Sequence, residues 1–221
     1  MTTHGNKMRA LRVAGLLVLA WALWLAVMLA LGWLVTHVLP GTRLGAADLA
    51  VDVWLADHRT GLLDPASATA TGLCSTTNVF VIGAVAAIAA SVVLRHWWPA
   101  LLLVVALVGE LWMFLVTAMI TGRPRPQVAH LDAALPPTSS FPSGHTAAAV
   151  CLFGGIAVIV CRATAAWWRY LVVAVAVVLV LAVAASRIYR GAHNPTDALG
   201  AVVLAVPWLL LCARLLTPRE R

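Results

Sequence analysis

Three short polar stretches hold most of the side chains that could carry chemistry. Residues 122–126, 142–145 and 186–197 contribute four arginines, two histidines and a carboxylate, and each stretch adjoins a long apolar run. Guanidinium groups match phosphate oxygens in geometry, and a helix N-terminus presents free N–H groups to an anion. Together the stretches indicate chemistry on a phosphate group at the edge of a membrane.

His145 stands where an apolar helix is expected to begin. Ser143 is a good N-cap residue and Gly144 allows a close approach of the backbone, so His145 falls in the first helical turn. In that position its ring lies beside an anion bound at the helix N-terminus. The alternative is an ordinary helix cap with a histidine on the surface.

The second histidine is followed by a carboxylate. Asn194 and Pro195 suit the N-cap and first position of a helix, which puts Asp197 at the third position. Asp197 can fold back toward the ring of His193, fixing one nitrogen and leaving the other free as a nucleophile or base. The alternative is a capping aspartate near an exposed histidine.

Arginines accompany both histidines. Arg125 lies between two prolines, which make the chain rigid and aim its side chain, and Arg187 lies near the end of an apolar run. Both are predicted to bind phosphate through their guanidinium forks. For Arg123 and Arg190 the sequence favours contact with lipid headgroups or a structural role.

The rest of the chain predicts a membrane protein. Hydrophobic residues make up 62% of the 221 residues and charged residues only 10%, against roughly 25% charge in a soluble domain. Apolar runs of about 20 residues can span a bilayer, where they must be helical. The predicted spans are 11–38, 77–94, 99–121, 146–161, 170–189 and 195–215. The fold class is therefore all-α: a polytopic bundle of six transmembrane helices, one domain over residues 1–221.

Basic residues set the predicted orientation. With six alternating spans they gather at one end, namely Lys7, Arg9, Arg12, Arg95, Arg162, Arg169 and Arg214. The positive-inside tendency makes that end cytoplasmic, so the polar stretches face the extracytoplasmic side. The composition, poor in lysine and rich in alanine and valine, favours a bacterial plasma membrane. This distribution accounts for much of the net charge of +7, so no nucleic-acid partner is predicted.

Residues 40–75 separate the first two spans. Their polar and apolar side chains alternate at helical spacing, which predicts a short interfacial helix over the bundle. This helix is either a scaffold or a lid for substrate entry. Of the four cysteines, only Cys74 is expected to face outward, so no disulfide framework is predicted. No cluster with metal-ligand spacing lies outside the phosphate site, so neither a metal nor another cofactor is expected.

The polar stretches resemble the three motifs of the type 2 phosphatidic acid phosphatase family, integral-membrane lipid phosphatases related to vanadium haloperoxidases. The matching segments are Arg125-Pro126, then Pro142-Ser143-Gly144-His145, then Ser186-Arg187 with five residues before His193 and three more before Asp197. The resemblance implies metal-free phosphoryl transfer through a phosphohistidine at His193, whose ring Asp197 holds. His145 would protonate the leaving oxygen and then activate water. Arg125, Arg187 and the turn at Ser143 and Gly144 would bind the phosphate.

One position departs from that pattern. The family's first motif opens with a lysine seven residues before the arginine of Arg-Pro, and Ala118 occupies this place. Either Arg123 substitutes as a phosphate ligand, or the phosphate is bound with fewer charges. Glu110 lies deeper in the same span, where a carboxyl group is costly. It is predicted either to be buried for structural reasons or to line a substrate cavity.

These observations favour a membrane lipid phosphatase. Its expected substrate is a lipid phosphomonoester or pyrophosphate, such as an isoprenoid pyrophosphate, phosphatidic acid or phosphatidylglycerophosphate, and membrane lipids surround it. One alternative is a lipid phosphotransferase, in which an alcohol replaces water. Another is a non-catalytic protein that binds or transports lipid phosphates, although such a protein needs no acid and nucleophile pair.

Overall fold

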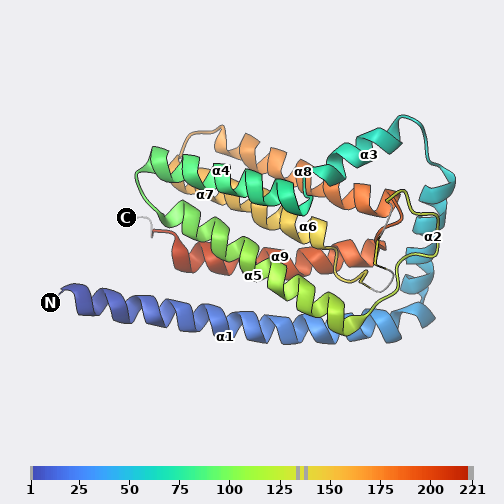
Figure 1. Cartoon of the computed structure of the whole chain (residues 1–221), viewed down its shortest axis with the longest axis horizontal. Helices are drawn as coiled ribbons and strands as arrows, with labels where there is room; N and C mark the ends of the chain where they lie inside the picture. The colour runs from blue at the N-terminus through green and yellow to red at the C-terminus, as the bar shows by residue number, and fades with distance from the viewer. Residues whose placement is uncertain (1, 133–134, 137–138, 219–221) are drawn as a thin grey trace.

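Six apolar helical segments run side by side and form a bundle (Figure 1). The structure is a computed structural model that describes residues 2–132, 135–136 and 139–218. The segments are α1 (Thr2–His37), α4 (Thr76–Leu94), α5 (Trp98–Thr121), a continuous run over Gly144–Ala163, α8 (Arg169–Tyr189) and α9 (Pro195–Leu216). Each is long and apolar enough to cross a membrane. The predicted all-α, polytopic fold with six spans is confirmed.

The span boundaries lie close to those predicted, except at the start of α1. This helix begins at Thr2, whereas its apolar run begins at Leu11. Helical hydrogen bonding continues through the polar residues that precede the run, because a helix can extend beyond the membrane into water. The fourth span is also irregular: α6 (Gly144–Ala149) passes through a π-helical turn, η2 (Val150–Gly154), into α7 (Gly155–Ala163).

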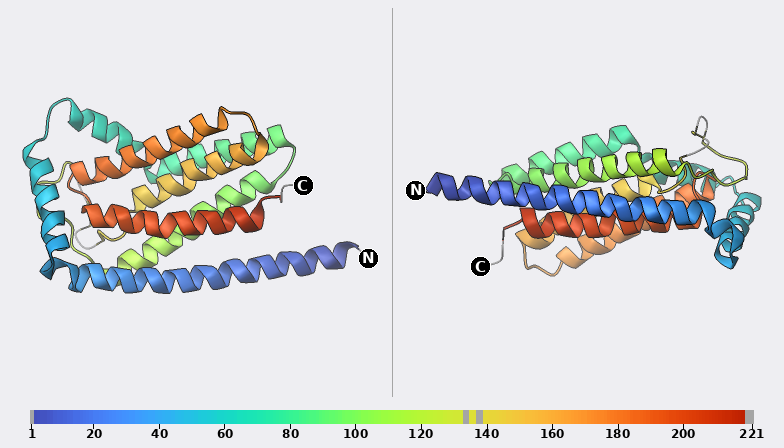
Figure 2. Two further views of the ribbon diagram at one scale, coloured as in Figure 1. Left: turned by 180° about the vertical axis from the view of Figure 1, so that it is seen from behind. Right: turned by 90° about the horizontal axis from the view of Figure 1, so that it is seen from below.

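The two ends of the bundle differ in chemistry. Both chain termini and the α4–α5 and α7–α8 turns lie at one end, which we call the basic end (Figures 1 and 2). The described residues of the segment 122–143 and the segment 190–194 lie at the opposite end, which we call the polar end. The predicted site residues are therefore gathered at one end of the spans.

Two helices, rather than the single interfacial helix predicted, cover the polar end. After a short 3-10 turn, η1 (Leu39–Gly41), come α2 (Arg43–Asp57) and α3 (Leu63–Gly72), and α2 runs across the helix ends toward α3 (Figure 1). Tertiary contacts break the helix between them. Arg59 donates to the Tyr189 carbonyl at 3.2 and 3.1 Å, and the Thr60 amide donates to the Tyr189 hydroxyl at 3.0 Å.

A close crossing of α1, α5 and α9 fixes the centre of the bundle. A Cβ atom on Gly109 of α5 would lie 2.3 Å from the Trp208 ring of α9. The Trp208 indole donates to the Ala106 carbonyl at 3.1 Å, and the Trp21 indole of α1 donates to the Gly109 carbonyl at 2.8 Å. Small residues let helix backbones approach closely in membranes. The crossing sets where α5 delivers residues 122–126 relative to the start of α9.

We expect Gly109→Ala to destabilise the protein by about 1–3 kcal/mol, the usual cost of overpacking a tight interior. Alanine favours a helix over glycine, so the loss would come from the collision with Trp208. The melting temperature in one detergent measures it. Gly15→Ala on α1, where a Cβ meets nothing within 4 Å, is the control. Equal melting temperatures for wild type and Gly109→Ala would contradict a tight crossing.

Candidate active site

The two predicted catalytic histidines meet two of the predicted phosphate-binding arginines in one cavity of about 370 Å³. His145, His193, Arg125 and Arg187 line its part at the polar end. The cavity continues between α4 and α5 along apolar side chains, including Val79, Phe80, Leu107, Leu111, Phe114 and Leu115. It therefore offers positive charge and two imidazoles next to an apolar channel.

His193 is buried in the loop between α8 and α9, with 3% of its surface exposed. Burial, together with the charges of Arg187 and Arg125, holds the pKa of His193 well below its ordinary value, so the ring is neutral at neutral pH. Its Nδ1 lies 2.7 Å from the Ser140 carbonyl oxygen, which can only accept a hydrogen bond. Nδ1 therefore carries the proton, and Nε2 has a free lone pair.

Asp197 is fully buried and accepts hydrogen bonds from several donors. As predicted, Asn194 caps α9 and Asp197 completes a capping box, accepting from the Asn194 amide at 2.7 Å and side chain at 3.1 Å. Ser140 Oγ donates to the same oxygen at 2.5 Å, and Arg123 donates to the other oxygen. His193 Nδ1 is 3.8 Å away, too far for a hydrogen bond. Asp197 therefore acts on the His193 ring only through its charge, and the Ser140 carbonyl makes the hydrogen bond to the ring.

Ser140 is the site residue that sequence reasoning missed. Its hydroxyl holds Asp197 while its carbonyl holds His193, and its amide donates to the Arg123 carbonyl at 3.1 Å. Ser140 thus ties the first polar stretch to the third. The available signal was only a small polar residue before the turn at Pro142, which is too common to identify a role.

Arg123 lies behind His193 and does not line the cavity that holds the two histidines. Its guanidinium, in a side chain that is 8% exposed, contacts Asp48 at 3.1 Å, Thr196 Oγ1 at 2.8 Å and Asp197. The prediction that Arg123 contacts phosphate does not fit this geometry, because both terminal nitrogens contact these buried partners and the side chain does not line the cavity. The structural role that the sequence favoured fits better.

Arg125 points into the cavity and is held by neutral groups. It donates to the Pro136 carbonyl at 2.6 Å, to the Ala192 carbonyl and to Ser139 Oγ at 3.3 Å. Within the described part of the chain, no carboxylate lies within salt-bridge distance of its guanidinium. Carbonyl partners fix the orientation of Arg125 without cancelling its charge, which leaves that charge available to an anion.

Arg187 is held differently. It pairs with Asp132 at 2.6 Å and donates to Thr71 Oγ1 of α3 at 2.9 Å. Its buried Nε has no hydrogen-bond partner among the described residues. Asp132 also pairs with Arg190 at 2.6 Å. Although burial alone would raise it, hydrogen bonds from Arg190 and Arg187 hold the pKa of Asp132 below its ordinary value.

The second polar stretch places His145 in the first turn of α6, as predicted, with its side chain in the cavity. Ser143 is fully buried: its Oγ lies 3.0 Å from Thr146 Oγ1, and its amide donates to the Asp197 carbonyl at 3.1 Å. Gly144 lines the cavity, and a Cβ there would lie 2.8 Å from the Phe114 ring. Ser143 therefore supports the turn, while Gly144 leaves room at its surface.

Ala118 and Glu110 both line the same cavity from α5. Ala118 is 3% exposed and belongs to the last turn of the helix, so a longer side chain there would extend into the space near the arginines. Glu110 is 2% exposed and lies two helical turns deeper, about 12 Å along the axis. Glu110 was predicted either to be buried for structural reasons or to line a substrate cavity. It is buried and also borders the cavity.

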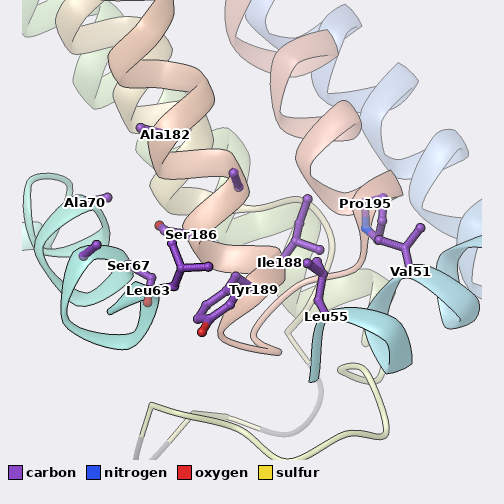
Figure 3. Close-up of a pocket in the computed structure, with 12 residues that line it drawn as sticks. Val51, Leu55, Leu63, Ser67, Ala70, Ala182, Ser186, Ile188, Tyr189 and Pro195 are labelled. Atoms are coloured by element: carbon purple, nitrogen blue, oxygen red, sulfur yellow. The ribbon is translucent and has the colours of Figure 1, made fainter. Parts of the chain in front are cut away.

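A larger apolar cavity lies elsewhere, between α2, α3 and the end of α8 (Figure 3). It measures about 490 Å³ and is bordered by residues such as Val51, Leu55, Leu63 and Ser186. It contains neither histidine nor arginine in its lining, so it does not suit phosphate chemistry. Arg187, the next residue after Ser186, lines the cavity of the two histidines instead.

Metal-ligating side chains do not gather in the described part of the chain. No group of three or more His, Cys, Asp or Glu residues there could hold a metal ion. Positive charge at the cavity comes from Arg125 and Arg187.

Known proteins resemble this chain in sequence and in fold. The family model described as "PAP2 superfamily" matches residues 97–221, more than half of the chain. The fold is similar to the crystal structure of the first transmembrane PAP2 type phosphatidylglycerolphosphate phosphatase from Bacillus subtilis, with a TM-score of 0.72 and 22% identity. That likeness covers 88% of this chain and 92% of the other. No curated protein matches the sequence.

The stability of the protein is expected to depend on pH through Asp52. This residue is 2% exposed on α2, and its carboxylate oxygens have no hydrogen-bond partner among the described residues. Burial, with the nearby charges of Asp48 and Asp197, raises the pKa of Asp52 to about 7. An unfolded aspartate titrates near ~3.9, so Asp52 costs the folded state progressively more stability as the pH rises from about 4 to 7.

We therefore expect Asp52→Asn to raise the melting temperature more at pH 8 than at pH 5. Asparagine cannot ionise, so the variant avoids the cost of a buried charge at the higher pH. Asp57→Asn, an exposed position on the same helix, is the control. A gain of the same size at both pH values would mean that Asp52 is not protonated in the folded state.

Proposed function

Because the chain belongs to the PAP2 superfamily, we propose that it is a membrane lipid phosphatase that hydrolyses a lipid phosphate through a phosphohistidine. The observation that carries this proposal is the cavity in which His145, His193, Arg125 and Arg187 converge beside an apolar channel. The arginines suit the phosphate, the histidines suit the transfer, and the channel suits a lipid chain.

His193 is the proposed nucleophile. Its Nε2 lone pair attacks phosphorus, an N–P bond forms, and the bond from phosphorus to the lipid oxygen breaks. His145 donates a proton to that leaving oxygen and afterwards takes a proton from the water that releases phosphate. The hydrogen bond from Nδ1 to the Ser140 carbonyl supports this assignment, because it leaves Nε2 unprotonated.

Arg125 and Arg187 are the proposed phosphate ligands. During phosphoryl transfer the negative charge is spread over the three equatorial oxygens, so catalysis depends on positioning and on fixed positive charge. The free Nε of Arg187 and the neutral partners of Arg125 leave donors and charge for those oxygens. Since these guanidinium groups supply the charge that Mg²⁺ would otherwise bring, we propose that hydrolysis is independent of metal ions.

The substrate is proposed to be a phosphomonoester or pyrophosphate lipid that enters from the membrane. Phosphatidylglycerophosphate is the first candidate, because the similar crystal structure is that of a phosphatidylglycerolphosphate phosphatase. Phosphatidic acid and an isoprenoid pyrophosphate complete the panel. We place the cavity on the extracytoplasmic side, because Arg95, Arg162 and Arg169 lie at the basic end.

The first test is phosphate release from this panel in detergent micelles with EDTA. Wild type should release phosphate, and His193→Ala should abolish both release and any phosphoenzyme trapped by rapid quench. His145→Ala should slow lipid phosphates much more than an activated aryl phosphate, whose leaving group needs little protonation. His96→Ala, at the α4–α5 turn of the basic end, is the control.

Three results would count against the proposal. Activity that vanishes in EDTA and returns with Mg²⁺ would overturn metal independence. A labelled intermediate that persists in His193→Ala would remove this residue as the nucleophile. Headgroup exchange with an alcohol and no release of phosphate would identify a transferase instead.

Ala118→Lys tests the geometry of the phosphate site. A lysine on the last turn of α5 should reach the cavity near the two arginines and add one positive charge. We expect vanadate, an analogue of phosphate, to inhibit this variant at lower concentration than wild type. Ala118→Met adds a long side chain without charge and controls for size. Unchanged inhibition in a folded Ala118→Lys variant would show that the lysine does not reach the anion.

A further inference from the structure

The interfacial helix α2 reaches the catalytic centre through one buried side chain. Asp48, 5% exposed, accepts from the Thr196 amide at 3.1 Å and from the Thr196 hydroxyl, both in the first turn of α9. It also pairs with Arg123 at 3.1 Å. Arg123 in turn contacts Asp197. Asp48 lies 149 positions before Asp197 in the chain. In the structure, Arg123 contacts both of these carboxylates and so links them.

Arg123, Asp48 and Asp197 together differ in net charge from an isolated ion pair. Arg123 alone would neutralise the charge of Asp197, leaving little to stabilise a cation at His193. Because Asp48 shares the same guanidinium, the three groups carry one net negative charge when both carboxylates are ionised. That charge lies behind His193, whose Nδ1 is 3.8 Å from Asp197. In a buried setting such charges are weakly screened.

This arrangement matters in the proposed covalent step. When Nε2 of His193 bonds to phosphorus, the imidazole becomes positively charged, and its direct partner, the Ser140 carbonyl, is neutral. On the Nδ1 side of the ring, away from phosphorus, the carboxylates behind His193 supply negative charge that stabilises the imidazolium. Resting on the proposed function, we propose that Asp48 is a positioning residue: it holds Arg123 and α9 in place and keeps the group behind His193 negatively charged.

Asp48→Asn provides the test, because asparagine keeps the shape and an oxygen acceptor but removes the charge. We expect kcat and the rate of phosphoenzyme formation to fall by roughly 10- to 100-fold, the range of a misplaced catalytic group. KM should stay nearly constant, since Arg125 and Arg187 are untouched. Asp57→Asn, exposed on the same helix, should match wild type.

Substrates with different leaving groups distinguish the proposed role of Asp48 from that of His145, the proposed general acid. Positive charge develops on His193 whatever leaves, so the loss in Asp48→Asn should persist with an activated aryl phosphate, where the loss in His145→Ala shrinks. A lowered melting temperature with normal kcat would make Asp48 merely structural and overturn the proposal. A raised KM with normal kcat would place its effect on substrate binding and also overturn it.

Hydrogen exchange tests the positioning without relying on turnover. Asp48→Ala removes the acceptor of the Thr196 amide, so the peptide over residues 190–197 should exchange faster than in wild type or Asp57→Asn. If wild type releases no phosphate, the proposed function fails, and this comparison still decides whether Asp48 holds the loop of His193. Equal exchange in Asp48→Ala and Asp57→Asn would overturn the positioning role.

Discussion

Arg123 places one positive charge between two buried carboxylates, Asp48 and Asp197, and the polar end is built around that contact. Each group alone would be costly to bury, and removing one partner from such a set typically costs about 3–5 kcal/mol. The contact joins three parts of the chain: α2, the segment after α5 and the start of α9. Since His193 lies two residues before that start, the position of its ring depends on the contact of Arg123 with the two carboxylates.

The layer formed by α2 and α3 covers the polar end and also contacts its arginines directly. On the α3 side, Thr71 contacts Arg187 and Ser67 contacts Arg190, at 2.9 and 3.1 Å. Asp132, in the segment between α5 and α6, joins the same two arginines. The layer holds the polar ends of α8 and α9 from outside the bundle, and the catalytic cavity lies on their inner side. Of the two predicted roles for this segment, the contacts favour the scaffold.

Arg125 and Arg187, the two arginines of the cavity, have different kinds of partner. Arg125 is oriented by carbonyl groups, which leave its charge intact, whereas Arg187 shares a carboxylate with Arg190. An incoming anion would therefore meet one arginine with no carboxylate in salt-bridge distance among the described residues and one that is paired with a carboxylate. The absence of a lysine at Ala118 makes the charge of Arg125 more important, because the cavity has fewer cations than the family's first motif usually provides.

The sequence by itself determined the spans, the cap of α9 and four polar residues of the cavity, His145, His193, Arg125 and Arg187. Apolar runs must be helical in lipid, and Asn194 with Asp197 forms a capping box through local contacts alone. Only the tertiary structure decided the partners of Arg123, Ser140 and Asp48, because these lie on segments far apart in the chain. The spacing of His193 and Asp197 suggested a direct contact, but the carboxylate accepts two local hydrogen bonds from Asn194 and two long-range ones from Arg123 and Ser140. Long-range hydrogen bonds such as these depend on how the helices pack, which local spacing does not encode.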